Sequence, residues 1–165
     1  MNPSPPPQPI PPVPPAPTIT PADFTGFLHS EIPLTRAMGM TVAAWDGKSV
    51  TLAAPLGPNQ NHADTGFGGA ISTMGIMAGY SLLHLLLQEL HISNRLLIQK
   101  SSTDYLRPID ADFTATACLP EPPMLAEFLH MLRHRRRARL SVVSQVQCKR
   151  MVAATHTGLY VAMLY

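Results

Sequence analysis

The spacing of apolar residues predicts a short helix and a β-hairpin near the start of the folded part of the chain. Between Phe24 and Gly39 the apolar residues recur at roughly helical spacing, and Pro33 must break or restart that helix. Glycine is a common helix C-cap, so we expect the helix to end at Gly39. Two strand-like runs follow at 40–45 and 49–55, and the Asp-Gly pair between them is typical of a hairpin turn.

An uncharged run, residues 66–87, is the most unusual part of the sequence. It contains no Asp, Glu, Lys or Arg, and it is long enough to cross a membrane. Its many Gly, Ser and Thr residues and its lack of basic flanks favour a buried helix of a folded protein instead. We therefore expect a long helix covered by a sheet, with no membrane association, and a small membrane protein is the weaker alternative.

Four more strands are expected after the long helix. Alternating apolar and polar residues predict strands within 95–108, 112–119, 138–149 and 151–165, with a short helix at 124–134. Six strands and one long helix in this order most economically give an antiparallel sheet curled around its own helix. The pattern therefore predicts an α+β fold.

Composition separates a tail from one domain. Residues 1–22 hold eleven of the eighteen prolines, so we expect a disordered tail there and a single domain over 23–165. The tail is either a spacer or a ligand for a proline-binding module.

Only 13% of the residues are charged and 45% are hydrophobic, which suggests that a partner subunit covers part of the apolar surface. The net charge of +2 is too small for bulk attraction to nucleic acid.

The residues that usually carry metals or covalent catalysis are sparse. Cys118 and Cys148 lie in strand-like runs without a CxxC pair, so we expect two buried thiols in a reducing compartment. The histidines show no metal-ligand spacing, and no GxSxG motif occurs, so we expect neither a metal, a cofactor nor a serine-hydrolase site. The N-terminus has no basic segment followed by an apolar stretch, which favours a cytoplasmic protein.

Three segments carry a family resemblance: IPLTRAMGM at 32–40, NQNHADTGFGGAIS at 59–72 and STDYLRPI at 102–109. Together they resemble hotdog-fold thioesterases, and above all the thioesterase domain at the C-terminus of YiiD-type acetyltransferases. The resemblance covers about residues 24–165. It implies the hotdog fold, an acyl-CoA or acyl-carrier-protein thioester as substrate, and a homodimer whose sheets join edge to edge around two interface sites. Some relatives pair further into tetramers.

Thioester hydrolysis needs hydrogen-bond donors for the carbonyl oxygen and a group that delivers water. The junction 59–69 offers both. The first-turn N–H groups of Gly68 and Gly69 could hold the oxyanion, or these glycines could only pack the helix start against a strand. Asp64, the one carboxylate in this loop, could activate water or attack the thioester. Alternatively, Asp64 or Thr65 could simply cap the helix.

Other residues near this junction are expected to contact the substrate. His62 and Asn61 could polarise the carbonyl or orient water, although a loop histidine can also bond only to backbone. The further candidates are Asn59, Thr65, Phe67, Thr73 and Met77. Phenylacetate-type thioesterases carry an acid about two turns into the long helix, and residues 72–80 contain none. Their mechanism therefore does not transfer directly, and a non-catalytic acyl-CoA-binding scaffold is the alternative function.

Arginines supply candidate contacts for the phosphates of coenzyme A. Five of them lie between residues 133 and 139, Arg136 among them, and Arg107 stands apart. The cluster could instead be a solvated hairpin. It has no interleaved aromatic residues, which argues against nucleic-acid binding.

Overall fold

The computed structural model describes residues 17–165. Most of the expected tail lies outside these residues, and Pro21 and Ala22 already belong to the first helix. The elements are α1 (Pro21–Glu31), α2 (Pro33–Ala37), β1 (Thr41–Trp45), β2 (Ser49–Ala54), η1 (Gly57–Asn59), α3 (Gly68–Glu89), β3 (Asn94–Tyr105), β4 (Phe113–Cys118), α4 (Pro122–Arg135), β5 (Arg137–Cys148) and β6 (Met151–Leu164).

Six strands form one antiparallel sheet in the order β1-β2-β4-β5-β6-β3. The expected hairpin joins β1 and β2. Its turn holds Gly47 at a positive φ of 85°, and Asp46 Oδ1 accepts hydrogen bonds from the N–H groups of Lys48 (2.8 Å) and Ser49 (2.6 Å). These hydrogen bonds lower the pKa of Asp46. Asp, Gly and Lys at 46–48 thus fix the hairpin that opens the sheet.

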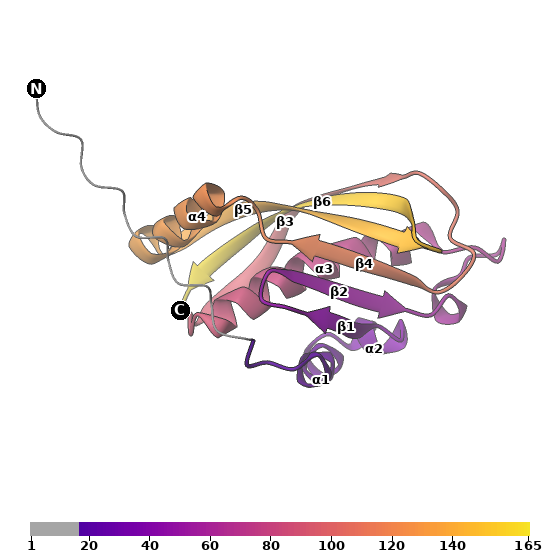
Figure 1. Ribbon diagram of the computed structural model, residues 1–165, viewed down its shortest axis with the longest axis horizontal. Coiled ribbons are helices and arrows are strands. Elements are labelled where there is room, and N and C mark those ends of the chain that lie inside the picture. Colours follow the sequence, from indigo (N-terminus) through magenta and orange to yellow (C-terminus); the bar gives the residue numbers. More distant parts are fainter. Residues whose placement is uncertain (1–16) are drawn as a thin grey trace, which may run out of the picture.

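The sheet covers α3, as the uncharged run predicts (Figure 1). By length and composition α3 could span a membrane, yet 72% of its most apolar window is buried inside the protein. Gly75 and Gly79, one turn apart, let β6 approach closely. A Cβ on Gly75 would stand 2.4 Å from the Cβ of His156, and one on Gly79 would stand 2.3 Å from the hydroxyl of Tyr160. This arrangement is the hotdog fold that the family resemblance implies.

The two edges of the sheet differ. The β1 edge is covered by α1: Thr25 Oγ1 accepts the N–H of Val42 at 2.8 Å, and His29 Nε2 donates to the carbonyl of Met40 at 2.7 Å. The β3 edge has no helix over it within residues 17–165, and most of its side chains are exposed. The open edge is therefore β3.

Three local expectations need correction or refinement. The first helix does restart at Pro33, which gives two helices, and Gly39 follows them with a positive φ of 63°. Cys118 is exposed at the end of β4 and only Cys148 is buried, so the prediction of two buried thiols was half wrong. The arginine cluster is not a hairpin: it spans the last turn of α4 and the start of β5, with Arg136 in the left-handed conformation between them.

Candidate functional site

Asn61 organises the tip of the loop that leads into α3. Its Oδ1 accepts the N–H groups of Ala63 (2.8 Å) and Thr65 (3.2 Å), and its own N–H donates to the carbonyl of Thr65 at 2.7 Å. This closed turn holds Asp64 at a positive φ of 58°. Asn61 and Thr65 therefore shape the loop, which is the ordinary work of asparagine in turns.

The two candidate groups for handling water, His62 and Asp64, stand exposed at the loop tip. Neither side chain has a hydrogen-bond partner among the described residues 17–165. Asp64 is not the helix cap, because α3 begins one residue after Phe67, which occupies the N-cap position without a side-chain hydrogen bond. The capping role considered for Asp64 and Thr65 is therefore wrong, and the carboxylate of Asp64 remains available for chemistry.

The base of the loop is anchored in the protein interior. Asn59 is only 2% exposed, and its Nδ2 donates to the carbonyls of Met38 (2.8 Å) and Pro55 (2.7 Å). The Phe67 N–H donates to the carbonyl of Asn59 at 2.7 Å. Asn59 thus holds the loop in place from inside the fold, and the expectation that it contacts substrate is not supported by this position.

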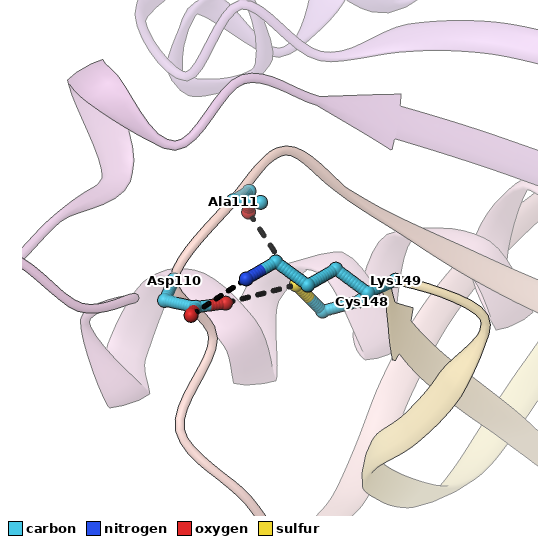
Figure 2. A network of polar contacts seen from close by, with 4 residues as sticks. All are labelled: Asp110, Ala111, Cys148 and Lys149. Atoms are coloured by element: carbon cyan, nitrogen blue, oxygen red, sulfur yellow. Dashed lines mark hydrogen bonds and ion pairs between the residues drawn. The ribbon is translucent and has the colours of Figure 1, made fainter.

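A polar network fixes the segment behind the loop. The Gly66 N–H donates to the carbonyl of Ile109 at 2.7 Å. Figure 2 shows Cys148, at the end of β5, and Lys149, in the β5–β6 turn, pointing toward Asp110 and Ala111. Lys149 Nζ lies 2.8 Å from Asp110 Oδ2. The hydrogen bond from Lys149 lowers the pKa of Asp110. Asp110 thereby ties the β3–β4 connection to the β5–β6 turn. The carbonyl of Ile109 in the same connection fixes the position of Gly66.

The first turn of α3 presents unpaired backbone donors. Among the described residues, the N–H groups of Gly68 and Gly69 have no acceptor, and no side chain caps the helix. Such N–H groups carry the positive end of the helix dipole. Gly69 is exposed and Gly68 is half-buried, so a substrate oxygen can reach this end of the helix.

Two aromatic rings frame these glycines. The Phe67 ring, 56% exposed, lies so close that a Cβ on Gly69 would stand 2.4 Å from it. The Tyr105 hydroxyl donates to the carbonyl of Gly68 at 2.8 Å, and its ring would be in ordinary contact with a Cβ on Gly68. The glycine at 69 therefore makes room for Phe67, while Tyr105 of β3 positions the helix start.

A polar seam continues from Tyr105 along the contact between α3 and β3. Ser72 Oγ lies 3.0 Å from Thr103 Oγ1, and Ser101 Oγ lies 2.9 Å from Nε2 of the buried His156. Sequence reasoning considered Ser72 as a group that could hold a water, but it did not identify Ser101, Thr103 or His156 as part of the site. The available signal was that Ser101, Thr103 and Tyr105 alternate along one strand face, which should be apolar where it covers a helix.

The face of α3 that the sheet leaves partly uncovered begins at Thr73 and passes Ile76, Tyr80 and His84. Thr73 Oγ1 donates to the carbonyl of Gly69 at 2.8 Å, and Tyr80 Oη lies 3.3 Å from His84 Nδ1. Burial raises the pKa of Tyr80 and lowers that of His84, so both are neutral near pH 7. Met77 is only 6% exposed and belongs to the core, so the expectation that it contacts substrate is not supported in the single chain.

The two candidate phosphate contacts lie at opposite ends of the molecule. Arg107 lies two residues after Tyr105, the last residue of β3 and the one that bonds to Gly68 of α3, and its guanidinium contacts Met151 Sδ at 3.8 Å. Arg136 donates to the terminal carbonyl of Tyr165, at the end that holds α4 and the C-terminus (Figure 1). Within one chain the structure therefore brings Arg107, but not Arg136, to the glycine end of α3.

The site is open in a single chain. One cavity of about 310 Å³ lies among Gly39, Thr41, Pro55 and Phe113, and another of about 370 Å³ lies between α4 and β5. Residues 59–69 line neither cavity.

Among residues 17–165 no group of three or more His, Cys, Asp or Glu residues is arranged to hold a metal ion. The arrangement offers backbone donors, a carboxylate and apolar surface, which suits attack of water on a carbonyl group.

Comparison with known proteins identifies the family and the fold. Residues 22–164 match the family described as "Putative thioesterase (yiiD_Cterm)". A protein of unknown function from Chlorobaculum tepidum is 23% identical with a TM-score of 0.83, over 88% of this chain and 98% of that one. A structure titled as a putative thioesterase from Shewanella oneidensis is 24% identical with a TM-score of 0.78, over 87% and 96%. Because both structures share less than a quarter of their residues with this chain, they show the fold alone. The family match spans nearly all of the described residues, so the chain belongs to the thioesterase family of YiiD C-terminal domains, with the hotdog fold.

Proposed function

We propose that this protein hydrolyses acyl thioesters of coenzyme A or of an acyl-carrier protein, at the N-terminus of α3. The observation that carries the proposal is the pair of unpaired N–H groups on Gly68 and Gly69, at an exposed helix start that follows the Asp64 loop. Membership of a thioesterase family supports the reaction class. Removing one comparable donor from an oxyanion hole typically costs about a hundredfold in kcat, so two such donors are a substantial part of the catalysis required.

In the proposed reaction the thioester carbonyl oxygen accepts hydrogen bonds from Gly68 and Gly69. Asp64 takes a proton from a water molecule as the water oxygen forms a bond to the carbonyl carbon. The negative charge that develops on the carbonyl oxygen is held by the two N–H groups. Collapse of the tetrahedral intermediate re-forms the C=O bond and breaks the C–S bond, and the leaving thiolate takes the proton that Asp64 holds, which regenerates the carboxylate. His62, next along the loop tip, orients the water.

The acyl chain is proposed to lie along the uncovered face of α3. Phe67 and Thr73 stand at its start, and Ile76 and Tyr80 continue it in the direction of the helix axis. A second copy of the chain, joined through the open β3 edge, would cover this face and exclude water. The two cavities described above lie elsewhere in the chain, so neither of them is the proposed acyl site. Arg107, at the same end, is the proposed phosphate contact of the chain itself.

The proposal is tested by thiol release from a panel of acyl-CoA and acyl-carrier-protein thioesters of increasing chain length. Wild-type protein should turn over at least one of them. Asp64→Asn should lower kcat about a hundredfold or more, because the amide cannot take the proton. Asparagine tolerates the positive φ at this position, so the variant should keep the loop conformation.

Glu127→Gln is the matched control, since it also removes one exposed carboxylate but lies on α4. It should leave kcat unchanged. Equal rates for wild type and Asp64→Asn would remove the base from the mechanism, and absence of turnover on every thioester would overturn the hydrolase assignment.

One observation favours the alternative of a non-catalytic acyl-CoA-binding protein. Residues 72–80 of α3 carry no acid, and Asp64 stands on a loop rather than on the helix. Tight binding of an acyl-CoA by calorimetry, without release of free thiol on the same sample, would identify the binding function. Binding accompanied by thiol release identifies the enzyme.

A further inference from the structure

We infer that two copies of this chain pair through β3 in one particular register, and that this pairing places Asn94 of the second copy beside Tyr105 and Gly68 of the first. The register follows from the chain's own side chains. The role of Asn94 in catalysis rests on the proposed function above.

The β3 edge has the features of a strand that pairs in an assembly. It is twelve residues long and has no helix over it within the described chain, whereas α1 occupies the β1 edge. It also exposes apolar side chains that a monomer would normally bury: Leu97 is 50% exposed and Ile98 is 38% exposed. A long, open and apolar edge that is neither charged throughout nor broken by proline is expected to pair with another strand.

The pairing partners in the sheet show which face each β3 residue occupies. Leu96 pairs with Ala162 and Ser101 with Gly158, on the face that covers α3. Arg95, Leu97, Lys100, Ser102 and Asp104 lie on the opposite face, and an irregularity between Ile98 and Lys100 reverses the alternation. Any partner strand must match these faces, because directly opposite residues of paired strands point to the same side.

Two-fold symmetry limits the possible registers further. When two copies of one strand pair antiparallel about a two-fold axis, the numbers of any two residues that lie opposite each other add up to the same total. Two such registers near the middle of β3 match the faces of the residues named above. The first sets Leu97 opposite Ser102 of the second copy, and the second sets Leu97 opposite Lys100.

Charge selects the first register. This register sets Arg95 of each copy opposite Asp104 of the other copy, so the dimer contains two such contacts, both on the outer face of the sheet. Both side chains are exposed, and within residues 17–165 neither makes an ion pair or a side-chain hydrogen bond. The second register sets Arg95 opposite Ser102 and the charged Lys100 opposite Leu97. Opposite charges directly across two strands are stabilising, so the pairing of Arg95 with Asp104 decides the register.

The same register brings Asn94 of the second copy opposite Tyr105, on the face that covers α3. Directly opposite side chains have Cβ atoms about 5 Å apart. Asn94 Nδ2 donates to the carbonyl of Ile92 at 2.8 Å, whereas its Oδ1 is buried and has no partner in the single chain. Tyr105 in turn holds the carbonyl of Gly68. Asn94 is therefore a positioning residue: it lies opposite Tyr105, which holds the start of α3, and it acts on the site through Tyr105.

The pairing also brings Arg136 to the site from the second copy. The Leu164 N–H donates to the carbonyl of Arg136 at 2.9 Å, and Leu164 pairs with Asn94. Arg136 and Asn94 therefore lie at the same end of one chain. Antiparallel pairing moves that end next to the Tyr105 end of the other copy, which reconciles the arginine cluster with a phosphate-binding role.

Cysteine cross-linking tests the register without any need for activity. In a Cys118→Ser background, Leu97→Cys with Ser102→Cys should form a disulfide-linked dimer on mild oxidation, because the two positions face each other across the pair. Leu97→Cys with Lys100→Cys is the matched control, on the same face and strand, and should stay unlinked. Linkage of the control, or of neither variant, would overturn the register.

A charge exchange gives an independent readout. Arg95→Asp should weaken the dimer about tenfold in sedimentation experiments, since two like-charged pairs replace two opposite ones. Combining it with Asp104→Arg should restore the affinity. No change with Arg95→Asp, or no recovery in the double variant, would contradict the pairing.

Mixing two impaired variants tests the role of Asn94. Asn94→Ala should raise KM for the thioester with little change in kcat, and Asp64→Asn should lower kcat. At thioester concentrations well below KM, a mixed dimer of the two has one intact site, so the mixture should recover about a quarter of wild-type activity if Asn94 serves the other copy's site. No recovery would place Asn94 outside it. If cross-linking succeeds and wild type shows no turnover, the register stands and the proposed function fails.

Discussion

At the scale of single residues, His156 shows how the fold determines the state of a buried group. Ser144 Oγ donates to the carbonyl of Gly75 at 2.8 Å, so it can only accept from Nδ1 of His156, 3.4 Å away. Nε2 is then the unprotonated nitrogen and accepts from Ser101. The imidazole is neutral, fully buried, and ties β3, β5 and β6 to α3.

Burial lowers the pKa of His156 below its ordinary value of 6.5. Below about pH 6.5 the unfolded chain therefore binds a proton that the folded chain does not, so the free energy of unfolding should fall as the pH decreases and level off at higher pH. Urea unfolding at pH 5.5 and 7.5 measures this. His156→Gln should show a smaller difference between the two pH values than wild type.

Direct titration provides the check if that variant folds poorly. The ring protons of His156 in wild-type protein, followed by NMR, should titrate with a midpoint below 6.5. A midpoint at or above that value would contradict the neutral, buried state.

At the scale of the elements, much of the fold was readable from the sequence. The uncharged run predicted α3, and the Asp-Gly pair predicted the first hairpin, because each depends on neighbours along the chain. The exposure of Cys118 and the end of α4 at Arg135 were missed, because burial at an element's end depends on what packs there. The N-cap position of Phe67 was missed because no side chain caps α3, so the sequence carries no capping residue that marks the start of the helix.

The glycines of α3 make a prediction at this scale. Gly79→Ala should destabilise the protein by about 1–3 kcal/mol, because its Cβ would overlap the fully buried Tyr160 ring. Gly26→Ala, in the middle of α1 with nothing within 4 Å, should stabilise it by about 0.5–1 kcal/mol. Chemical denaturation of the two variants measures both effects. Equal changes would show that β6 does not press on α3 at Gly79.

At the scale of the whole molecule, the site is built from parts that are distant in sequence. Asp64 and the glycines of α3 lie close in the chain, so sequence motifs identified them together. Tyr105 and Ser101 join them only because β3 runs beside α3. The sequence could not place Arg136, because within one chain Arg136 lies at the opposite end of the molecule from these glycines and only the proposed pairing would bring it to them. Site residues that a second copy would contribute can be identified only from the three-dimensional register.

The most direct test of the central claim is a crystal structure with an acyl-CoA analogue in which a methylene group replaces the thioester sulfur. The account predicts that the ketone oxygen lies about 3 Å from the N–H groups of Gly68 and Gly69, with Asp64 on the side from which water attacks. Asn94 of the second copy should lie next to Tyr105 of the copy that binds the analogue. An analogue bound elsewhere, such as between α4 and β5, or a ketone oxygen pointing away from the α3 N-terminus, would contradict it.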